Sequence, residues 1–566
     1  QREGQPLDRQ LATELALREG ARAVILPTIA QVGGVIRVSL EVIDPKTGVT
    51  VYSESADGRG VESVLPSLDS ALADVRGRLG ETMAAVSTDR VALEKATTPN
   101  LEALRAFSLG LRARTDGRAR DAEALYREAV RLDPGFSMAW LRLAFMRFVE
   151  GDEDGTRKYL AEAQAHRDRL TRRELLFMEG AEATLDDAPR AVDRFRLLAQ
   201  LYPDDYRARY NAAYFAHFDL LDSAQAREAM AGTDVPQNAQ RPSAVYMAAT
   251  AELALGDAPA AIALFEKAVT LGSRGHLRDY IDAHAALRQY DLARRVAALQ
   301  TPVGLPAQDI ESRLFEASLP LDQGDWAGAR AAMARLRADA AATGVNENVL
   351  GELDMMALSL RVYAPDEAFA ADLRRWADDQ RTRFGQANAM LQREFIFRLL
   401  AGAWMAAHTG DLALAGELVA AVGEHPQLRR YPATAGMARI AKAEIALAEG
   451  RPAEAIDLLA DDHAKGQGLY FGRSVLMRAL AAAGDRKQAA QVAAWLSKER
   501  ARAFGEPTNA LGWQLANVAE STLALHALAR LAEPGSAQAV QAAQAFEKAW
   551  PKGESLPETA RRDAGP

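Results

Sequence analysis

A helix-turn-helix pattern recurs along most of this chain at intervals close to 34 residues, and it limits the folds that the chain can adopt. In each copy, a turn glycine has a small residue seven positions before it and an alanine five positions after it. Gly117, with Gly110 and Ala122 in these places, sets the frame. The same frame, with single departures, holds at Gly151, Gly256, Gly324, Gly410, Gly450 and Gly484. Two helices joined by such a turn cannot bury their apolar faces alone, so neighbouring copies must stack.

The distances between turns indicate where this array is regular. Gly117 and Gly151 are 34 residues apart. Asp186 and Leu221 take the turn position at the next two steps of 35 residues, each with an alanine five residues later. After Gly324 the intervals change to 86 and then 40 residues, which predicts longer or less regular helices in that part of the chain.

The copy at residues 101–135 carries the most complete pattern. Leu109-Gly110 and Ala113 lie on its first helix, Ala122, Tyr126 and Ala129 lie on its second, and Pro134 ends it. These residues, with the period of 34, resemble the tetratricopeptide repeat. The resemblance implies a mainly α fold: a tetratricopeptide-type α-solenoid of roughly a dozen helical hairpins. In such a unit, small residues let two backbones approach, and a large side chain fills the space beside them.

The first 90 residues have a different pattern. Strands are predicted at Ala21–Ile29, Val35–Ile43 and Val49–Ser55, with turns at Gly33-Gly34 and Asp44–Gly48 between them. Residues 8–19 and 62–86 have helical spacing. The sequence therefore predicts a small α+β domain with a three-stranded antiparallel meander in front of the repeats. This domain is expected to lack its first strand, because the chain begins within it.

These patterns divide the chain into four parts. Residues 1–90 form the α+β domain, and residues 95–340 form the regular repeat array. Residues 341–553 form less regular helical hairpins, the last of which is expected to turn at Pro534-Gly535. Residues 554–566 have the composition of a disordered tail.

The composition excludes several classes of function. The 77 acidic and 68 basic residues give a net charge of −9, which argues against nucleic acid as a partner. The absence of cysteine excludes disulfides, thiolate nucleophiles and zinc–thiolate sites. No stretch approaches 18 apolar residues, so direct membrane insertion by this fragment is not expected.

Motifs with catalytic spacing are incomplete. Residues 166–170, HRDRL, resemble a kinase catalytic loop, but Arg173 stands where that loop needs asparagine. The acidic turn at 151–155 resembles a calcium loop, but Ala163 stands where that loop needs glutamate. The eight histidines form no paired metal-binding motif. The sequence therefore predicts no enzyme in this fragment, and no cofactor or metal site.

A binding surface is the remaining candidate for function. In a tetratricopeptide superhelix, the first helix of each unit lines the concave groove. Exposed aromatic and arginine side chains there would suit an extended peptide or a partner helix. The alternative is that the same side chains pack between units. The candidate groove residues are Phe107, Leu111, Arg114, Leu141, Phe145, Phe148, Tyr246 and Trp404.

Two further stretches indicate a family. Gly33–Val38, Ile43-Asp44 and Thr47-Gly48 resemble the TolB-like amino-terminal domain found beside tetratricopeptide repeats in bacterial signalling proteins. Residues 97–114, TTPNLEALRAFSLGLRAR, and 201–218, LYPDDYRARYNAAYFAHF, resemble the carboxy-terminal region of peptide modification system cyclases. The resemblance implies a class III adenylate or guanylate cyclase domain upstream, and with it a membrane anchor.

The sequence thus predicts a non-catalytic sensory or scaffold region of a bacterial signalling protein, which binds a peptide or protein. One alternative is a free-standing adaptor, and another is the sensor region of a winged-helix regulator or serine/threonine kinase. With an upstream anchor the region is expected in the periplasm; otherwise it lies in the cytoplasm.

Overall fold

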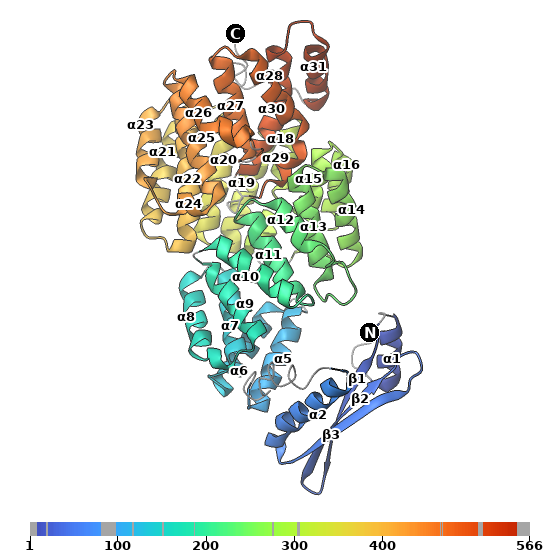
Figure 1. Ribbon diagram of the computed structural model, residues 1–566. Coiled ribbons are helices and arrows are strands. Elements are labelled where there is room, and N and C mark those ends of the chain that lie inside the picture. Colours follow the sequence, from blue (N-terminus) through green and yellow to red (C-terminus); the bar gives the residue numbers. More distant parts are fainter. Residues whose placement is uncertain are drawn as a thin grey trace. The chain divides into compact units, whose positions relative to one another are not determined.

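The computed structural model confirms a mainly α fold of paired helical hairpins that resemble tetratricopeptide repeats, preceded by a three-stranded antiparallel sheet (Figure 1). Gly117, Gly151, Asp186 and the expected tail at 554–566 lie outside the residues that the structure describes. Two compact units divide the chain, residues 1–182 and 183–566. The structure describes residues 8–18, 21–80, 98–115, 118–149, 152–185, 187–273, 277–302, 306–464, 466, 468–507 and 513–551.

The sheet has the predicted order, and its central strand has the predicted bounds. The strands are β1 (Val24–Val32), β2 (Val35–Ile43) and β3 (Thr50–Arg59), in the order β1-β2-β3. Val32 pairs with Val35 across Gly33-Gly34, whose φ angles of 57° and 82° suit glycine in a two-residue hairpin turn. Helices α1 (Arg9–Arg18) and α2 (Val64–Arg78) and a 3₁₀ turn at Val61–Ser63 complete this part.

Alternation along β2 decides which face of the sheet is covered. Ile36, Val38, Leu40 and Val42 are buried, as their spacing of two predicts. Helix α2 contacts β2 and β3 and covers this face there. Ile29 lies on the edge strand β1, where it pairs with Val38 of β2, and its side chain remains exposed.

The first unit continues with helices that pair as the repeat predicts. Helices α5 and α6 pack together, as do α7 and α8. A Cβ atom added to Gly110 on α5 would lie 2.6 Å from the Tyr126 ring on α6, so a glycine is needed for this close approach. A 3₁₀ turn spans Arg167–Arg169. The helices are α5 (Leu101–Thr115), α6 (Ala119–Leu132), α7 (Ser137–Val149), α8 (Glu153–Ala165) and α9 (Arg172–Ala183).

Every regular element that the structure describes in the second unit is a helix. Its helices up to residue 343 are α10 (Ala188–Leu201), α11 (Tyr206–Phe218), α12 (Ser223–Met230), α13 (Arg241–Leu255), α14 (Ala258–Thr270), α15 (Arg278–Ala286), α16 (Tyr290–Ala297), α17 (Pro306–Glu311), α18 (Phe315–Asp322) and α19 (Trp326–Thr343). The remaining helices are α20 (Glu347–Arg361), α21 (Phe369–Phe384), α22 (Ala389–His408), α23 (Leu412–Val422), α24 (Gln427–Arg430), α25 (Pro432–Ala448), α26 (Pro452–Ala464), α27 (Tyr470–Ala482), α28 (Arg486–Lys498), α29 (Arg500–Gly505), α30 (Gln514–Leu531) and α31 (Ala537–Ala549).

The recurring turn combines a glycine that ends one helix with an aspartate that caps the next helix. Gly256 ends α13 in the left-handed conformation, with φ 101°, and Asp257 begins α14 by accepting a hydrogen bond from the Ala260 amide at 3.0 Å. The glycine satisfies the end of one helix and the aspartate caps the start of the next. The same pair recurs at Gly324-Asp325, Gly410-Asp411 and Gly484-Asp485.

The longer helices predicted after Gly324 are present. Helix α19 has 18 residues and α22 has 20, compared with 13 for α14. The predicted final hairpin is also confirmed, because α30 and α31 pack together on either side of Pro534-Gly535.

Helices α29 and α30 pack against hairpins that lie far from them in the sequence. Helix α29 contacts α13 and α15, and α30 contacts α18 and α20 as well as α27, which is nearer in the sequence (Figure 1). All five of these helices are the first of their hairpins. A Cβ atom on Gly505, at the end of α29, would lie 2.9 Å from the Ala254 backbone nitrogen of α13. The concave face formed by these first helices is therefore filled by the chain itself.

Candidate functional site

The predicted groove residues of the first unit fall into two groups. Phe107 and Leu141 are buried, and the Phe107 ring lies 4.8 Å from that of Phe136 and 5.8 Å from that of Tyr126. The prediction that these two line an open groove is wrong, because both side chains are buried. Phe145 on α7 is 43% exposed. Arg114 is exposed, and Leu111 and Phe148 are half-buried.

Of the two groove residues of the second unit, Trp404 is corrected. Trp404 on α22 is fully buried, with its ring 5.4 Å from that of Trp513 and 4.8 Å from that of Phe471. Tyr246 on α13 is half-buried, with its ring 4.8 Å from that of Phe265. Trp404 was expected on the concave face, and it is buried because the start of α30 covers it there.

A polar cluster surrounds Trp404. Its indole nitrogen donates to Glu444, which also accepts two hydrogen bonds from Arg478 at 2.7 and 2.8 Å and lies 2.9 Å from Nδ1 of His408. Burial alone would raise the pKa of Glu444, but the charges of Arg478 and His408 outweigh it and hold this pKa well below its ordinary value. The carboxylate thus joins α22, α25 and α27.

A second buried cluster joins α29 to α18. Asp322 on α18 accepts two hydrogen bonds from Arg500 and further ones from Tyr290 and Thr522. Burial would raise the pKa of Asp322, but Arg500 and Arg288 hold it below its ordinary value. Asp322 thus joins α18 to side chains of α16, α29 and α30.

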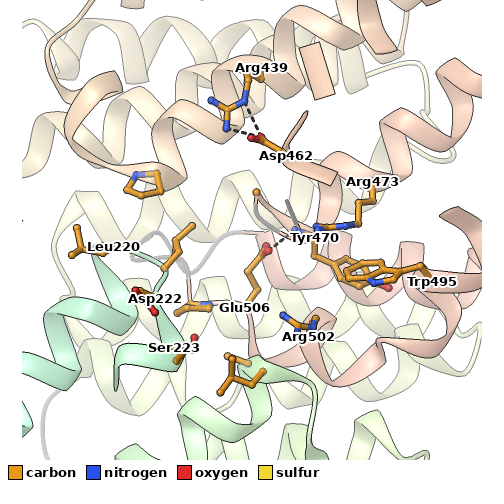
Figure 2. Close-up of a pocket in the computed structure, with 18 residues that line it drawn as sticks. Leu220, Asp222, Ser223, Arg439, Asp462, Tyr470, Arg473, Trp495, Arg502 and Glu506 are labelled. Carbon is orange, nitrogen blue, oxygen red and sulfur yellow. Dashed lines mark hydrogen bonds and ion pairs between the residues drawn. The ribbon is translucent and has the colours of Figure 1, made fainter. Parts of the chain in front are cut away.

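A cavity of about 530 Å³ opens between hairpins that are distant in the sequence (Figure 2). One side comes from the α11–α12 turn and the end of α13, and the other from α25 to α29. Its polar and apolar lining residues are Leu220, Leu221, Asp222, Ser223, Leu255, Pro432, Arg439, Asp462, Tyr470, Arg473, Trp495, Arg502, Glu506 and Pro507, together with small residues.

Three arginines line this cavity. Arg439 donates twice to Asp462, at 2.6 and 2.9 Å, and Arg502 donates through Nε to Glu499 at 3.2 Å. The Arg473 guanidinium lies 4.1 Å from the centre of the Trp495 ring, a cation–π contact. Burial lowers the pKa of Arg473, against the opposing effect of the Glu506 charge.

Glu506 lies at the centre of the view in Figure 2 and points toward Tyr470. Its carboxylate accepts hydrogen bonds from the Tyr470 amide and, at 2.8 Å, from the Asn517 side chain. Burial raises the pKa of Glu506 even with these donors present.

Ser223, at the start of α12, also lines the cavity. Its hydroxyl oxygen lies 3.1 Å from Nδ1 of His217, whose pKa burial lowers to about 4. A serine–histidine contact resembles the start of a nucleophilic site, but within the described part of the chain no carboxylate hydrogen-bonds this imidazole. The contact holds the turn before α12 and lacks the third group that would orient a catalytic base.

The cavity residues were not predicted from the sequence. Its walls come from segments up to 287 residues apart, from Leu220 to Pro507, and no spacing links them. One signal was present: Leu221 takes the turn position where other units have glycine, and it lines the cavity.

Two further observations concern the described residues. No described helix combines the length and the apolar character needed to cross a membrane. Within the same residues, no three histidine, aspartate or glutamate side chains converge in a way that could hold a metal ion.

Comparison with known proteins gives distant structural likenesses. No family model and no curated protein matches the chain. The Naa15/Naa10 structure bound to HypK-THB is 10% identical, with a TM-score of 0.20, over 81% of this chain and 80% of that one. The TPR domain of P58(IPK) is 14% identical, with a TM-score of 0.18, over 69% and 96%. A circular tandem repeat protein is 14% identical, with a TM-score of 0.14, over 82% and 98%. Likenesses at these scores carry no argument about function.

Proposed function

We propose that this chain is a non-catalytic sensory and scaffold region of a bacterial signalling protein, which binds a peptide or protein on its first hairpins. One observation carries the proposal: Phe145 on α7, the first helix of its hairpin, keeps 43% of its surface exposed. Arg114 on α5, the first helix of the preceding hairpin, is also exposed. Exposed aromatic and arginine side chains are the types that dominate binding energy at protein interfaces.

The second unit supports placing the partner on the first. There the first helices of four hairpins already contact α29 or α30. These first helices are α13, α15, α18 and α20. A peptide would have to displace these helices and the buried Arg500–Asp322 pair.

The test places a photo-crosslinking phenylalanine analogue at position 145 in the full-length protein within its native host. A peptide or protein crosslinked there is identified and then titrated against the purified chain by calorimetry. Phe145→Ala should weaken its binding at least tenfold. Leu299→Ala is the matched control, because Leu299 is 42% exposed and lies in the other unit. Equal binding by the wild type and Phe145→Ala would exclude this surface.

The resemblance to peptide modification system cyclases supports a class III nucleotide cyclase domain and a membrane anchor upstream. For the chain to act as a sensor, its ligand must bind two states of the repeat array with different affinity. Reading the coding sequence on the amino-terminal side of Gln1 tests this part. Cyclase motifs and a membrane span would support it. A winged helix or a kinase catalytic loop would replace it with a different effector, and a start codon directly before Gln1 would favour a free-standing adaptor.

A further inference from the structure

The cavity of the second unit has a surplus of hydrogen-bond donors. Its carboxylates already accept: Glu506 from the Tyr470 amide and Asn517, and Asp462 from Arg439. Asp222 accepts from the Gln225 amide at 2.9 Å, as the cap of α12. These acceptors are therefore engaged within the protein.

Two of the three guanidinium groups, those of Arg502 and Arg439, are only partly engaged. Arg502 uses Nε for Glu499, and its two terminal amino groups make no hydrogen bond to any residue between 8 and 551 that the structure describes. Under the same restriction, Nη1 of Arg439 makes none. Arg473, only 5% exposed, brings a third positive charge into the wall, held flat against Trp495. A ligand that complements these unused donors supplies hydrogen-bond acceptors, and two adjacent guanidinium N–H groups match the two oxygens of a carboxylate.

The wall formed by the α11–α12 turn carries local strain. Leu221 has φ 54°, in the left-handed region that costs a residue with a side chain roughly 1–2 kcal/mol. Glycine takes the corresponding position in later hairpins, for instance Gly256 with φ 101°. Strained non-glycine residues cluster at binding sites, where the side chain is needed in that position. Leu221 and Pro432 provide apolar side chains in the lining of the cavity.

We propose that this cavity binds a small organic oxyanion, whose charged end is held by Arg502 beside Arg473 and Arg439 and whose apolar part contacts Leu221 and Pro432. A cavity of 530 Å³ is within the range that holds small organic ligands. A carboxylate and a phosphate monoester share this chemistry. The site is independent of the protein-binding proposal, because the two concern different units of the chain.

Calorimetric titration of the full chain with three probes tests the proposal. N-acetyl-leucine carries a carboxylate, N-acetyl-leucinamide has the same shape without the charge, and phenyl phosphate carries a phosphate. N-acetyl-leucine should bind at least tenfold more tightly than the amide. Binding of phenyl phosphate alone would identify a phosphate ligand and still support an oxyanion site. Equal affinity for the acid and the amide, or no binding of either anion at about 10 mM, would overturn the proposal.

Variants locate the binding. Arg502→Gln should weaken the better anion at least tenfold, because Arg502 is partly exposed and its removal leaves no buried charge without a partner. Arg502→Lys, which keeps the charge but loses the paired donors, should give an intermediate loss. Arg294→Gln, at an exposed arginine on α16 outside the cavity, is the control and should bind as the wild type does. Unchanged affinity in a folded Arg502→Gln protein would place any binding elsewhere.

Discussion

Arg500 on α29 and Asp322 on α18 form a buried, two-point ion pair, with Nη2–Oδ2 at 2.7 Å and Nη1–Oδ1 at 3.1 Å, although 178 residues separate them. Arg500 also donates to the carbonyl of Ala286 at the end of α15. One guanidinium thus connects the late helix α29 with two earlier hairpins. The ordinary open groove of a helical-repeat array is closed here by contacts of this kind.

Removing Arg500 should strongly destabilise the second unit. Arg500→Ala leaves the Asp322 carboxylate buried beside fewer positive charges, and breaking such a buried pair costs about 3–5 kcal/mol. Urea unfolding followed by circular dichroism measures the loss. Arg294→Ala is the control: its partner Asp291 is exposed, so the cost should stay within about 0.5 kcal/mol. The double variant Arg500→Met plus Asp322→Leu should be more stable than Arg500→Ala, because it leaves no charge without its partner. Equal losses in Arg500→Ala and Arg294→Ala would show that the pair does not hold α29 in place.

At Leu221 the glycine variant should be more stable than the alanine variant, whereas at an ordinary helix position the alanine variant is the more stable. Its φ of 54° is unfavourable for any residue with a Cβ atom and neutral for glycine. Leu221→Ala loses the side-chain contacts and keeps the strain, whereas Leu221→Gly loses the contacts and relieves the strain. The glycine variant should therefore be about 1 kcal/mol more stable than the alanine variant. A more stable alanine variant would mean that the turn does not hold this conformation in solution.

Replacing two helical glycines with alanine should change the free energy of unfolding in opposite directions. Gly110 faces the Tyr126 ring, and a Cβ atom there would lie 2.6 Å from it, so Gly110→Ala must separate α5 from α6. We expect a loss of about 1–3 kcal/mol in the first unit, as for overpacked cores. A methyl group added at Gly416 on α23 would meet no atom of another side chain or helix within 4 Å, and Gly416→Ala should stabilise by up to about 1 kcal/mol. Thermal unfolding of both variants measures the contrast, and a neutral Gly110→Ala would contradict the packing of this hairpin.

His217 should make the second unit sensitive to mild acid. Burial lowers its pKa from 6.5 to about 4, so the folded state keeps the ring neutral while the unfolded state takes up a proton below pH 6.5. The contribution of the neutral His217 ring to the free energy of unfolding is fully present above pH 6.5. It is lost as the pH falls toward 4, by about 3 kcal/mol in total. The charge of Asp279 opposes this shift, and the effect of burial is the larger of the two.

Urea midpoints of the wild type and His217→Gln at pH 7.5 and pH 4.5 isolate this contribution. The wild type should lose more stability than the variant over this interval, because other groups titrate equally in both proteins. If both proteins lose the same amount, His217 is not buried as a neutral ring.

Local patterns were readable from the sequence alone because neighbouring residues decide them. The alternation along Val35–Ile43 gave the bounds and the buried face of β2, since side chains two apart share one face of a strand. The glycine frame located the hairpin turns, and Leu221 was placed correctly in that frame although it is not glycine. Each of these features depends on contacts within about 34 residues, which is the span of one repeat.

Tertiary structure alone decided which faces of the hairpins stay accessible. Trp404 and Phe145 occupy comparable first helices, yet Trp404 is covered by α30 and Phe145 is 43% exposed. The period of a repeat shows which face of a helix turns inward, but not whether a distant segment of the chain fills the space there. The cavity beside Arg502 has the same origin, because it forms only where α11–α13 meet α25–α29. The sequence therefore determined the repeating unit, whereas the packing of helices more than 200 residues apart determined the surfaces left for binding.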